Sequence, residues 1–528
     1  MTSETLTVAL GDRSYDIFFE RNIYPALQEW ICRFHPGGSV HVVTDRNVAS
    51  IYGDDIRRWL EGIPGGLLVL PAGEEHKTLS TVGRIYEFLA EGNAGRDSLV
   101  VAFGGGVIGD LAGFAAATYL RGISFVQVPT TLLAQVDSSV GGKTGFNLPQ
   151  GKNLAGAFHQ PRAVFIDDAF LLTLDDRNLR AGMAEVAKCG LAGDAGLWRR
   201  LAERKGRWSS FSGDDWRFVV RGAVAFKASV VEKDERESSL RKVLNLGHTV
   251  GHSMEHACGY GQILHGEAVA MGLAWEAILG HRLGATGEGL VDDIVSLLLG
   301  MGFRLDVPGV PLASISAAVG VDKKRVESGV DLPLILEPGR CEIRRVPLAE
   351  IRRELPAVRA EIRERSAGRE AAPADAVPPD SPGTVQSLER RVEANPRDTR
   401  AITLLADAYR RSGDIAAAWE AIQEVLERDP SDAAAQRVAA ELEKSHPGPP
   451  GEPPQGTLPL ENLLVLDEGA YTIRMADSVA TLGAEGERLR PAEPEGPAPE
   501  TPAAELSVEP QVEAPVEPQG PPTEPPAA

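Results

Sequence analysis

The chain has 528 residues, four cysteines and a formal net charge of −21 at pH 7. This length allows about three domains and a large hydrophobic core. The cysteines are scattered without a CxxC pair, which excludes a disulfide framework or cysteine-ligated zinc and favours a cytoplasmic protein. The N-terminus has no signal-peptide pattern and no apolar run approaches about 18 residues, so neither export nor a membrane partner is expected.

Residues 1–170 alternate short apolar runs with amphipathic stretches, a pattern typical of an α/β domain built around a parallel sheet. The expected strands are 40–44, 67–70, 99–103 and 125–128, with 164–166 as a further candidate. The expected helices are 79–91 and 110–119. In residues 171–360 helical periodicity dominates, which predicts an all-α second domain. Its expected helices are 175–191, 216–233, 245–258 and 267–283.

Composition changes after this second domain. Residues 361–385 are rich in Ala, Pro, Gly and Ser, which predicts a linker. Residues 386–445 are helical again, and an Asx-Pro pair recurs from Asn395-Pro396 to Asp429-Pro430. Between the pairs lie Ala406, Tyr409, Ala418 and Ile422, at spacings typical of a tetratricopeptide repeat. A generic helical hairpin is the alternative. One repeat is fewer than the roughly three that are usually needed, so this module would dock on the preceding domains, self-associate or bind a protein partner.

The C-terminal residues 446–528 hold much of the negative charge, with 15 Asp and Glu against 3 Arg, a net charge of −12. Their Glu-Pro, Pro-Ala and Gly-Pro units cannot bury a core, so a disordered acidic tail is expected. One apolar island, 458–489, would bind a partner or pack on the repeat module, and the sequence leaves both open. The acidic balance disfavours nucleic acid as a partner.

A glycine-rich turn follows the expected strand 99–103. It reads Gly104-Gly105-Gly106-Val107-Ile108-Gly109, matches G-x-G-x-x-G and leads into the helix at Asp110. Such a turn lets the backbone approach a pyrophosphate, whose charge the helix N-terminus stabilises. The usual acidic residue about 20 positions later is missing, and Arg121 stands near that place. Asp45, at the end of an earlier strand, is a substitute that could bond a ribose. Nucleotide binding in a variant arrangement is therefore predicted.

The densest group of reactive side chains lies at 241–252. His248 and His252 are four residues apart and would share one face of a helix. With His265 and Glu185 they offer the imidazoles and carboxylate that a catalytic divalent metal such as zinc requires. An isolated pair of helical histidines is more often structural. The neighbourhood nevertheless favours an active site, because it also contains the anion-binding side chains Lys227, Arg241 and Asn245.

Further anion-binding groups lie in short loops, at 129–131, 137–145 and 151–153. Taken in order, these segments resemble the 3-dehydroquinate synthase family over about residues 5–355. The matching segments are 73–77, 104–110, 129–131, 137–147, 152–153, 184–186, Lys188, 241–252, 265–269 and 322–324. The resemblance implies a Rossmann-like α/β NAD domain plus an all-α metal-binding domain, NAD and one divalent metal (zinc or cobalt) as cofactors, and a homodimer.

The resemblance also implies roles for individual residues. The implied NAD contacts are Asp45, Glu74, Lys77, Gly105, Gly106, Val107, Asp110, Thr130, Thr131, Asp137, Lys143, Lys152, Phe170 and Thr173. The implied metal ligands are Glu185, His248 and His265, which differs from the His248–His252 pairing that the spacing suggests. The implied phosphate contacts are Lys143, Asn153, Asn245, His252 and, from a neighbouring subunit, Arg121. The implied carboxylate contacts are Lys227 and Arg241, and further substrate contacts are Lys188, Lys323 and Lys324.

The implied reaction converts 3-deoxy-arabino-heptulosonate 7-phosphate into 3-dehydroquinate and phosphate, through transient oxidation by NAD, phosphate elimination, re-reduction and aldol closure. Three alternatives remain. A polyol dehydrogenase would share the fold and cofactors but has no need for the anion clamps. Cyclases that make aminocyclitol or valiolone precursors lack a substrate carboxylate, so Lys227 with Arg241 argues against them. A scaffold with an inactive catalytic domain would not need Glu185, His248 and His265.

Overall fold

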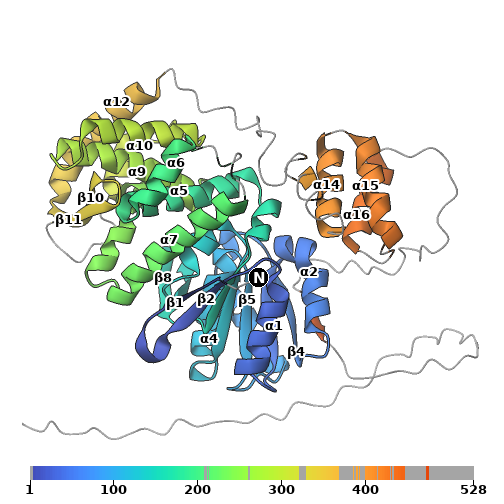
Figure 1. The fold of residues 1–528 in the computed structure, drawn as a ribbon. Helices are drawn as coiled ribbons and strands as arrows, with labels where there is room; N and C mark the ends of the chain where they lie inside the picture. The colour runs from blue at the N-terminus through green and yellow to red at the C-terminus, as the bar shows by residue number, and fades with distance from the viewer. Residues whose placement is uncertain are drawn as a thin grey trace, which may run out of the picture. The chain divides into compact units, whose positions relative to one another are not determined.

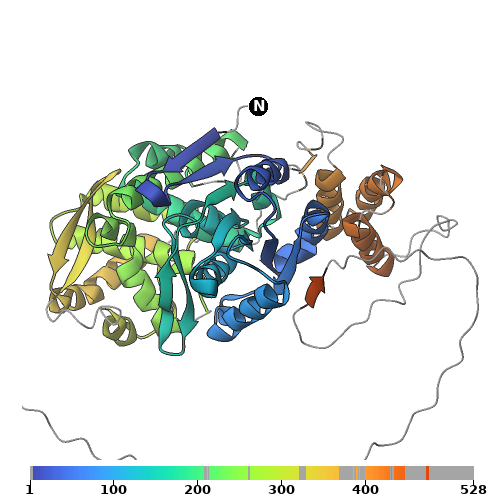
Figure 2. The same cartoon turned by 90° about the horizontal axis from the view of Figure 1, so that it is seen from below.

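The computed structural model describes residues 4–367 except 207, 209–210, 212, 260–261 and 320–328, followed by 385, 388–389, 392, 399–412, 414–428, 430, 433–445 and 471–474. The predictions on Lys323, Lys324 and nearly all of the acidic tail therefore lie outside the described residues. In the described part of the chain, no helix is both long and apolar enough to cross a membrane. An α/β domain and a helical domain lie side by side (Figures 1 and 2).

The α/β domain is built on one sheet with the strand order β1-β2-β9-β6-β5-β3-β4-β12. Its strands are β1 (Glu4–Val8), β2 (Tyr15–Phe19), β3 (Val40–Asp45), β4 (Gly65–Leu70), β5 (Leu99–Gly104), β6 (Ser124–Pro129), β9 (Ala163–Ile166) and β12 (Tyr471–Arg474). The six strands from β2 to β4 run parallel, and β1 and β12 pair antiparallel at the two edges. All five strands that the sequence predicts are confirmed, whereas the β1–β2 hairpin is an addition.

Two pairs of helices cover the sheet. The helices α1 (Ile23–Phe34) and α2 (Arg46–Leu60) pack on one face, and α3 (Leu79–Glu91) and α4 (Gly106–Thr118) pack on the other. All six residues of β5 are buried, because helices cover both faces of this central strand. That burial explains why its sequence is a continuous apolar run. The helix α4 begins four residues before the expected Asp110, so the glycine-rich turn itself forms the helix N-terminus.

In its described residues, the second domain is helical except for one hairpin. Its helices are α5 (Asp176–Ala192), α6 (Ala195–Glu203), α7 (Gly213–Lys233), α8 (His248–Cys258), α9 (His265–Arg282), α10 (Glu288–Gly300), α11 (Leu312–Ala318) and α12 (Leu348–Ser366). The expectation of an all-α domain was wrong for the hairpin of β10 (Val330–Glu337) and β11 (Arg340–Val346). Apolar side chains of β10 enter the core of this domain, which makes the hairpin part of it. The predicted domain end at residue 360 also falls inside α12.

Three helices of this domain approach one another more closely than side chains would normally permit. A Cβ atom on Gly272 in α9 would lie 1.7 Å from the carbonyl oxygen of Gly247, just before α8. A Cβ on Gly266, also in α9, would lie 2.0 Å from the carbonyl oxygen of Ala181 in α5. Glycine is therefore required at both positions, and α9 lies in backbone contact with α5 and α8.

The C-terminal module contains α14 (Thr399–Ser412), α15 (Ile415–Arg428) and α16 (Ala433–Ser445). Ala406, Ala418 and Ile422 are fully buried between these helices, and Tyr409 packs against them, as the sequence suggests. The assignment to the tetratricopeptide repeats stays a prediction. Of the island 458–489, only Tyr471–Arg474 is described, and it pairs with the edge strand β4. Such pairing satisfies the open backbone groups of an edge strand.

We predict that Gly272→Ala destabilises the protein by about 3 kcal/mol or more, because the new methyl group overlaps a carbonyl that cannot move without separating α8 from α9. Gly83→Ala is the matched control, since this helical glycine in α3 has nothing within 4 Å of its would-be Cβ. The control should stabilise the chain by about 0.4–1 kcal/mol. Thermal melting of both variants tests this, and equal melting temperatures would contradict it.

A second prediction concerns the end of the helical domain. Leu355, Val358 and Ile362 of α12 are buried, and Arg359 Nε donates to Asp306 Oδ2 at 3.0 Å. A chain ending at residue 367 should keep the melting temperature of the helical domain to within a few degrees. A chain ending at residue 354 should lose several kcal/mol, because each deleted core side chain contributes about 2–5 kcal/mol. Equal stability of the two truncations would show that α12 is not part of the domain.

Candidate active site

The candidate site lies at the carboxyl edge of the parallel sheet. The strands β5 and β6 end there at Gly104 and Pro129, and β3 ends at Asp45. Ligands in open α/β sheets bind beyond this edge, so the glycine-rich turn lies where the fold predicts a nucleotide site. The helical turn Ala134–Ser138 that follows β6 contacts α5 and α7 of the second domain. Elements of both domains therefore form the site.

A cluster of possible metal ligands forms where α5, α8 and α9 meet. Glu185 Oε1 lies 3.6 Å from His248 Nε2 and 3.5 Å from His265 Nε2. His252 belongs to the same cluster, because ring atoms of the three histidines lie within 4.8 Å of one another. Geometry alone thus offers two ligand sets, one with three histidines and one with Glu185 in place of His252.

The chemistry of this cluster fits a divalent metal. Among the described residues, neither oxygen of the fully buried Glu185 is hydrogen-bonded, although Lys188 Nζ is in ion-pair contact with Oε2. Burial opposes ionisation of Glu185, but the Lys188 charge brings its pKa down to about 2. Burial and Lys188 hold the pKa of His248 well below its usual range. His248 Nδ1 donates to the Leu246 carbonyl at 3.0 Å, which leaves Nε2 with a lone pair facing the carboxylate.

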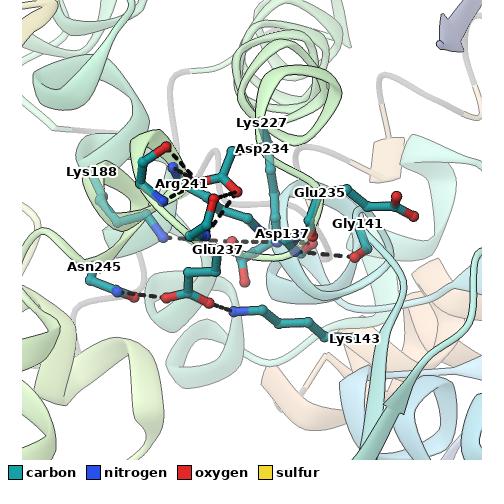
Figure 3. A network of polar contacts seen from close by, with 12 residues as sticks. Asp137, Gly141, Lys143, Lys188, Lys227, Asp234, Glu235, Glu237, Arg241 and Asn245 are labelled. Carbon is teal, nitrogen blue, oxygen red and sulfur yellow. Dashed lines mark hydrogen bonds and ion pairs between the residues drawn. The ribbon is translucent and has the colours of Figure 1, made fainter. Parts of the chain in front are cut away.

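A partly buried carboxylate, that of Asp137, connects this cluster to a second cation. Asp137 Oδ1 lies 3.5 Å from Lys188 Nζ and 2.8 Å from Lys227 Nζ (Figure 3). Burial alone would raise the pKa of Asp137, but Lys227 and Lys188 hold it well below its usual range. Burial lowers the pKa of Lys227, against the attraction of Asp137. The site therefore concentrates positive charge next to the possible metal ligands.

Arg241 lies in the same network and is held by its own loop. Its Nη2 donates to the Gly141 carbonyl at 3.1 Å, and its Nη1 donates to the Glu235 carbonyl. Asp234 accepts the backbone N–H groups of Arg241 at 3.0 Å and Ser239 at 2.7 Å (Figure 3). Burial opposes the charge on Asp234, but these donors hold its pKa well below its usual range. The two hydrogen bonds from Nη1 and Nη2 hold the guanidinium in place. Because a guanidinium has five N–H donors, others can still donate to an anion.

Two of the residues expected to bind phosphate, Lys143 and Asn245, contact the carboxylate of Glu237. Glu237 accepts from Asn245 Nδ2 at 2.7 Å and forms an ion pair with Lys143 Nζ (Figure 3). Glu237 adopts a left-handed backbone conformation, with φ of 60°. A carboxylate therefore neutralises the cation that a phosphate would need, and a substrate would have to displace it.

The nucleotide side of the site is organised around Lys77. Its Nζ donates to Asp110 Oδ2 at 2.5 Å and to Asn153 Oδ1 at 2.6 Å. Asn153 belongs to the hairpin of β7 (Lys143–Leu148) and β8 (Gly151–Phe158). This hairpin also supplies Lys152, so it brings predicted cofactor and phosphate contacts to the same place. Thr130 and Thr131 lie next to the glycine-rich turn, with Thr130 N donating to the Gly104 carbonyl at 3.0 Å.

Some predicted contacts have other partners in this structure. Asp45 Oδ1 accepts from Asn47 N at 2.9 Å and caps α2. Phe170 is buried and packs edge-on against Tyr52 and Phe103. Thr173 exchanges a 2.7 Å hydrogen bond with the Tyr52 hydroxyl. Arg121 is exposed, with φ of 68°. Their predicted roles in binding NAD or phosphate stay predictions.

Sequence reasoning missed four carboxylates that hold the site together. Asp234 and Glu237 bind the clamp residues, as described above. Glu276 in α9 accepts from Gly247 N at 2.7 Å and Val250 N at 3.0 Å, which caps α8. Glu255 in α8 contacts His265 and Lys152. Only Glu255 left a signal in the sequence, because it lies seven residues after His248 and three after His252, on the same helical face.

Comparison with known proteins identifies the family. Residues 67–181 match the model of the 3-dehydroquinate synthase N-terminal domain, and residues 182–325 match that of the C-terminal domain. A 3-dehydroquinate synthase from Geobacter metallireducens is 48% identical over 337 residues, which cover 63% of this chain and 92% of that protein. A 3-dehydroquinate synthase from Pelobacter propionicus is 46% identical over 60% of this chain and 89% of that protein.

Solved structures of two related cyclases are also similar. A 2-epi-5-epi-valiolone synthase from Streptomyces hygroscopicus with bound NAD⁺ and Zn²⁺ has a TM-score of 0.61 and 29% identity, covering 68% of this chain and 99% of that one. A 2-deoxy-scyllo-inosose synthase complexed with carbaglucose-6-phosphate, NAD⁺ and Co²⁺ has a TM-score of 0.59 and 28% identity, covering 67% and 99%. With relatives matched over about nine-tenths of their length and both family domains in order, the chain belongs to the 3-dehydroquinate synthase family.

Proposed function

We propose that the protein converts 3-deoxy-arabino-heptulosonate 7-phosphate into 3-dehydroquinate and phosphate. The observation that carries this proposal is the pair of buried cations Lys227 and Arg241, next to the metal-ligand cluster. Asp137 links Lys227 to Lys188, and Lys188 contacts Glu185. A sugar phosphate without a carboxylate would leave this second positive site unused.

Glu185, His248 and His265 would hold the metal, and the glycine-rich turn would hold the pyrophosphate of NAD. When bound, NAD⁺ would accept a hydride and return it within one turnover, while the metal would polarise the oxygen at the oxidised carbon. The chain itself would orient the substrate through two groups of anion-binding side chains.

Two separate groups of side chains would hold the two anionic groups of the substrate. Lys227 and Arg241 would bind the carboxylate. The phosphate would bind the second group of residues, Lys143, Asn153, Asn245 and His252, after displacing Glu237 from Lys143. Both contacts would orient the substrate for oxidation and phosphate elimination. Once the phosphate has left and the ring opens, the carboxylate contacts would still hold the flexible intermediate and limit the entropy lost before the new ring closes. Such orientation can lower a barrier by about 7 kcal/mol or more.

We also propose that the protein forms a homodimer and that its C-terminal module binds a protein partner. In a homodimer, Arg121 of a neighbouring subunit would reach the phosphate. This role fits the exposed position of Arg121 on its own subunit. The helical module of α14, α15 and α16 would bind a protein partner. Its packed apolar core is its own, so it is suited to act as a separate binding unit.

The direct test of the proposed reaction is phosphate release from the heptulosonate phosphate. With NAD⁺ far below the substrate concentration and zinc present, we expect about one phosphate per substrate and no accumulation of NADH, because the cofactor is regenerated. Phosphate and absorbance at 340 nm would be followed together. Stoichiometric NADH from a polyol, without phosphate release, would support a dehydrogenase instead.

The metal ligands are tested by three alanine variants. Glu185→Ala and His248→Ala should lose both bound metal and activity, whereas His252→Ala should keep the metal and lose activity through the phosphate. Elemental analysis of the purified proteins measures this directly. Loss of metal from the His248 and His252 variants, with metal retained by the Glu185 variant, would establish the three-histidine set and reject the assignment to Glu185.

The carboxylate clamp is tested by Arg241→Met, which removes the charge and keeps much of the side-chain volume. A charge-assisted hydrogen bond contributes about 1.5–3 kcal/mol, so kcat/KM should fall by roughly tenfold to 150-fold. Arg340→Met is the control, because this arginine side chain is 65% exposed in the β10–β11 turn. Unchanged kinetics in the Arg241 variant would move carboxylate recognition elsewhere.

A further inference from the structure

Glu255 is a buried carboxylate with no place in the proposed reaction. It lies on α8, on the same helical face as His248 and His252, and its side chain is 3% exposed. A buried charge is costly unless it is paired, so its partners indicate its role.

The two oxygens of Glu255 face different parts of the site. Oε2 lies 3.7 Å from His265 Nδ1, and Oε1 accepts a hydrogen bond from Lys152 Nζ. The other ring nitrogen of His265, Nε2, lies 3.5 Å from Glu185 Oε1. The imidazole therefore lies between two carboxylates. A proton on Nδ1, facing Glu255, leaves the Nε2 lone pair directed towards Glu185 and a metal beside it.

Lys152 connects Glu255 with residues on the nucleotide side of the site. Its Nζ lies 4.0 Å from Glu74 Oε1, and the same oxygen accepts from Asn147 Nδ2 at 2.8 Å. Asn147 Oδ1 accepts from Asn153 N at 2.9 Å. Asn153 in turn accepts from Lys77, which pairs with Asp110 at the start of α4. A continuous line of polar contacts thus runs from His265 through the β7–β8 hairpin to the glycine-rich turn.

We propose that Glu255 is a positioning residue that orients His265 for metal binding and, through Lys152, couples the metal site to the β7–β8 hairpin and the nucleotide site. The inference rests on the proposed metal site. It predicts that the metal affinity depends on residues that never touch the metal, and that bound NAD⁺ changes this affinity.

The first experiment measures the metal dissociation constant by chelator competition on the full-length chain, without substrate. Removal of a carboxylate partner of a metal-bound histidine weakens metal binding by about 10–100-fold, and we expect this for Glu255→Ala. Glu255→Gln should stay within a few-fold of the wild type, because the amide oxygen can take the place of the carboxylate oxygen that faces Nδ1. Glu288→Ala is the charge-matched control, since this side chain is 72% exposed on α10. Melting curves of the metal-free variants separate loss of folding from loss of orientation.

The coupling is tested with Lys152→Met and the double variant. Lys152→Met should weaken metal binding several-fold, and adding it to Glu255→Ala should have no further effect. Saturating NAD⁺ should shift the metal affinity of the wild type but not that of Glu255→Ala. The nitrogen chemical shifts of His265 should report a proton on Nδ1 in the metal-bound wild type and a mixture of ring states in the alanine variant.

Two results would overturn the proposal. If folded Glu255→Ala binds the metal within twofold of the wild-type affinity, Glu255 does not orient His265 and serves only as a counter-ion of Lys152. Additive effects of the two substitutions would reject the coupling. These measurements need no turnover, so their failure is distinguishable from a failure of the proposed reaction, which phosphate release reports.

Discussion

The close approach of α5, α8 and α9 is the constraint on which the site depends. Backbone contact at Gly266 and Gly272 places three helices so close that Glu185, His248 and His265, one from each helix, meet within ligand distance. The approach would leave amide groups at the start of α8 unsatisfied in the core, and Glu276 accepts two of them. Packing and hydrogen bonding therefore bring together side chains that lie 80 residues apart in the sequence, from 185 to 265.

The second constraint is electrostatic. The cations that are proposed to bind the substrate and the cofactor range from the buried Lys227 to the exposed Lys143, and buried charge is costly unless it is paired. Carboxylates of the chain itself pair with them, Asp137 with Lys227, Glu237 with Lys143 and Glu255 with Lys152. The same pairs that stabilise the fold thus hold the cations in position. In the proposed reaction, a substrate phosphate or carboxylate would replace or join one of these ion pairs.

Much of this organisation could be predicted from the sequence, for identifiable reasons. The strand β5 and the helix α3 were predicted well because burial on both faces and amphipathic periodicity leave clear patterns. The residues of the metal cluster were found because their types are rare in a core. The carboxylate Glu237 could not be predicted because one of its partners, Lys143, lies on a distant strand, and no local pattern records such a contact. The β10–β11 hairpin was missed because a short apolar run does not distinguish strand from helix.

In the proposed reaction, one site oxidises and re-reduces the same carbon within a single turnover. The most direct test uses heptulosonate phosphate with deuterium on the carbon that becomes the transient ketone, together with unlabelled NAD⁺. We expect the deuterium at the same carbon of the dehydroquinate formed, with none accumulating in the NAD pool. Product without deuterium, together with labelled NADH in solution, would contradict it.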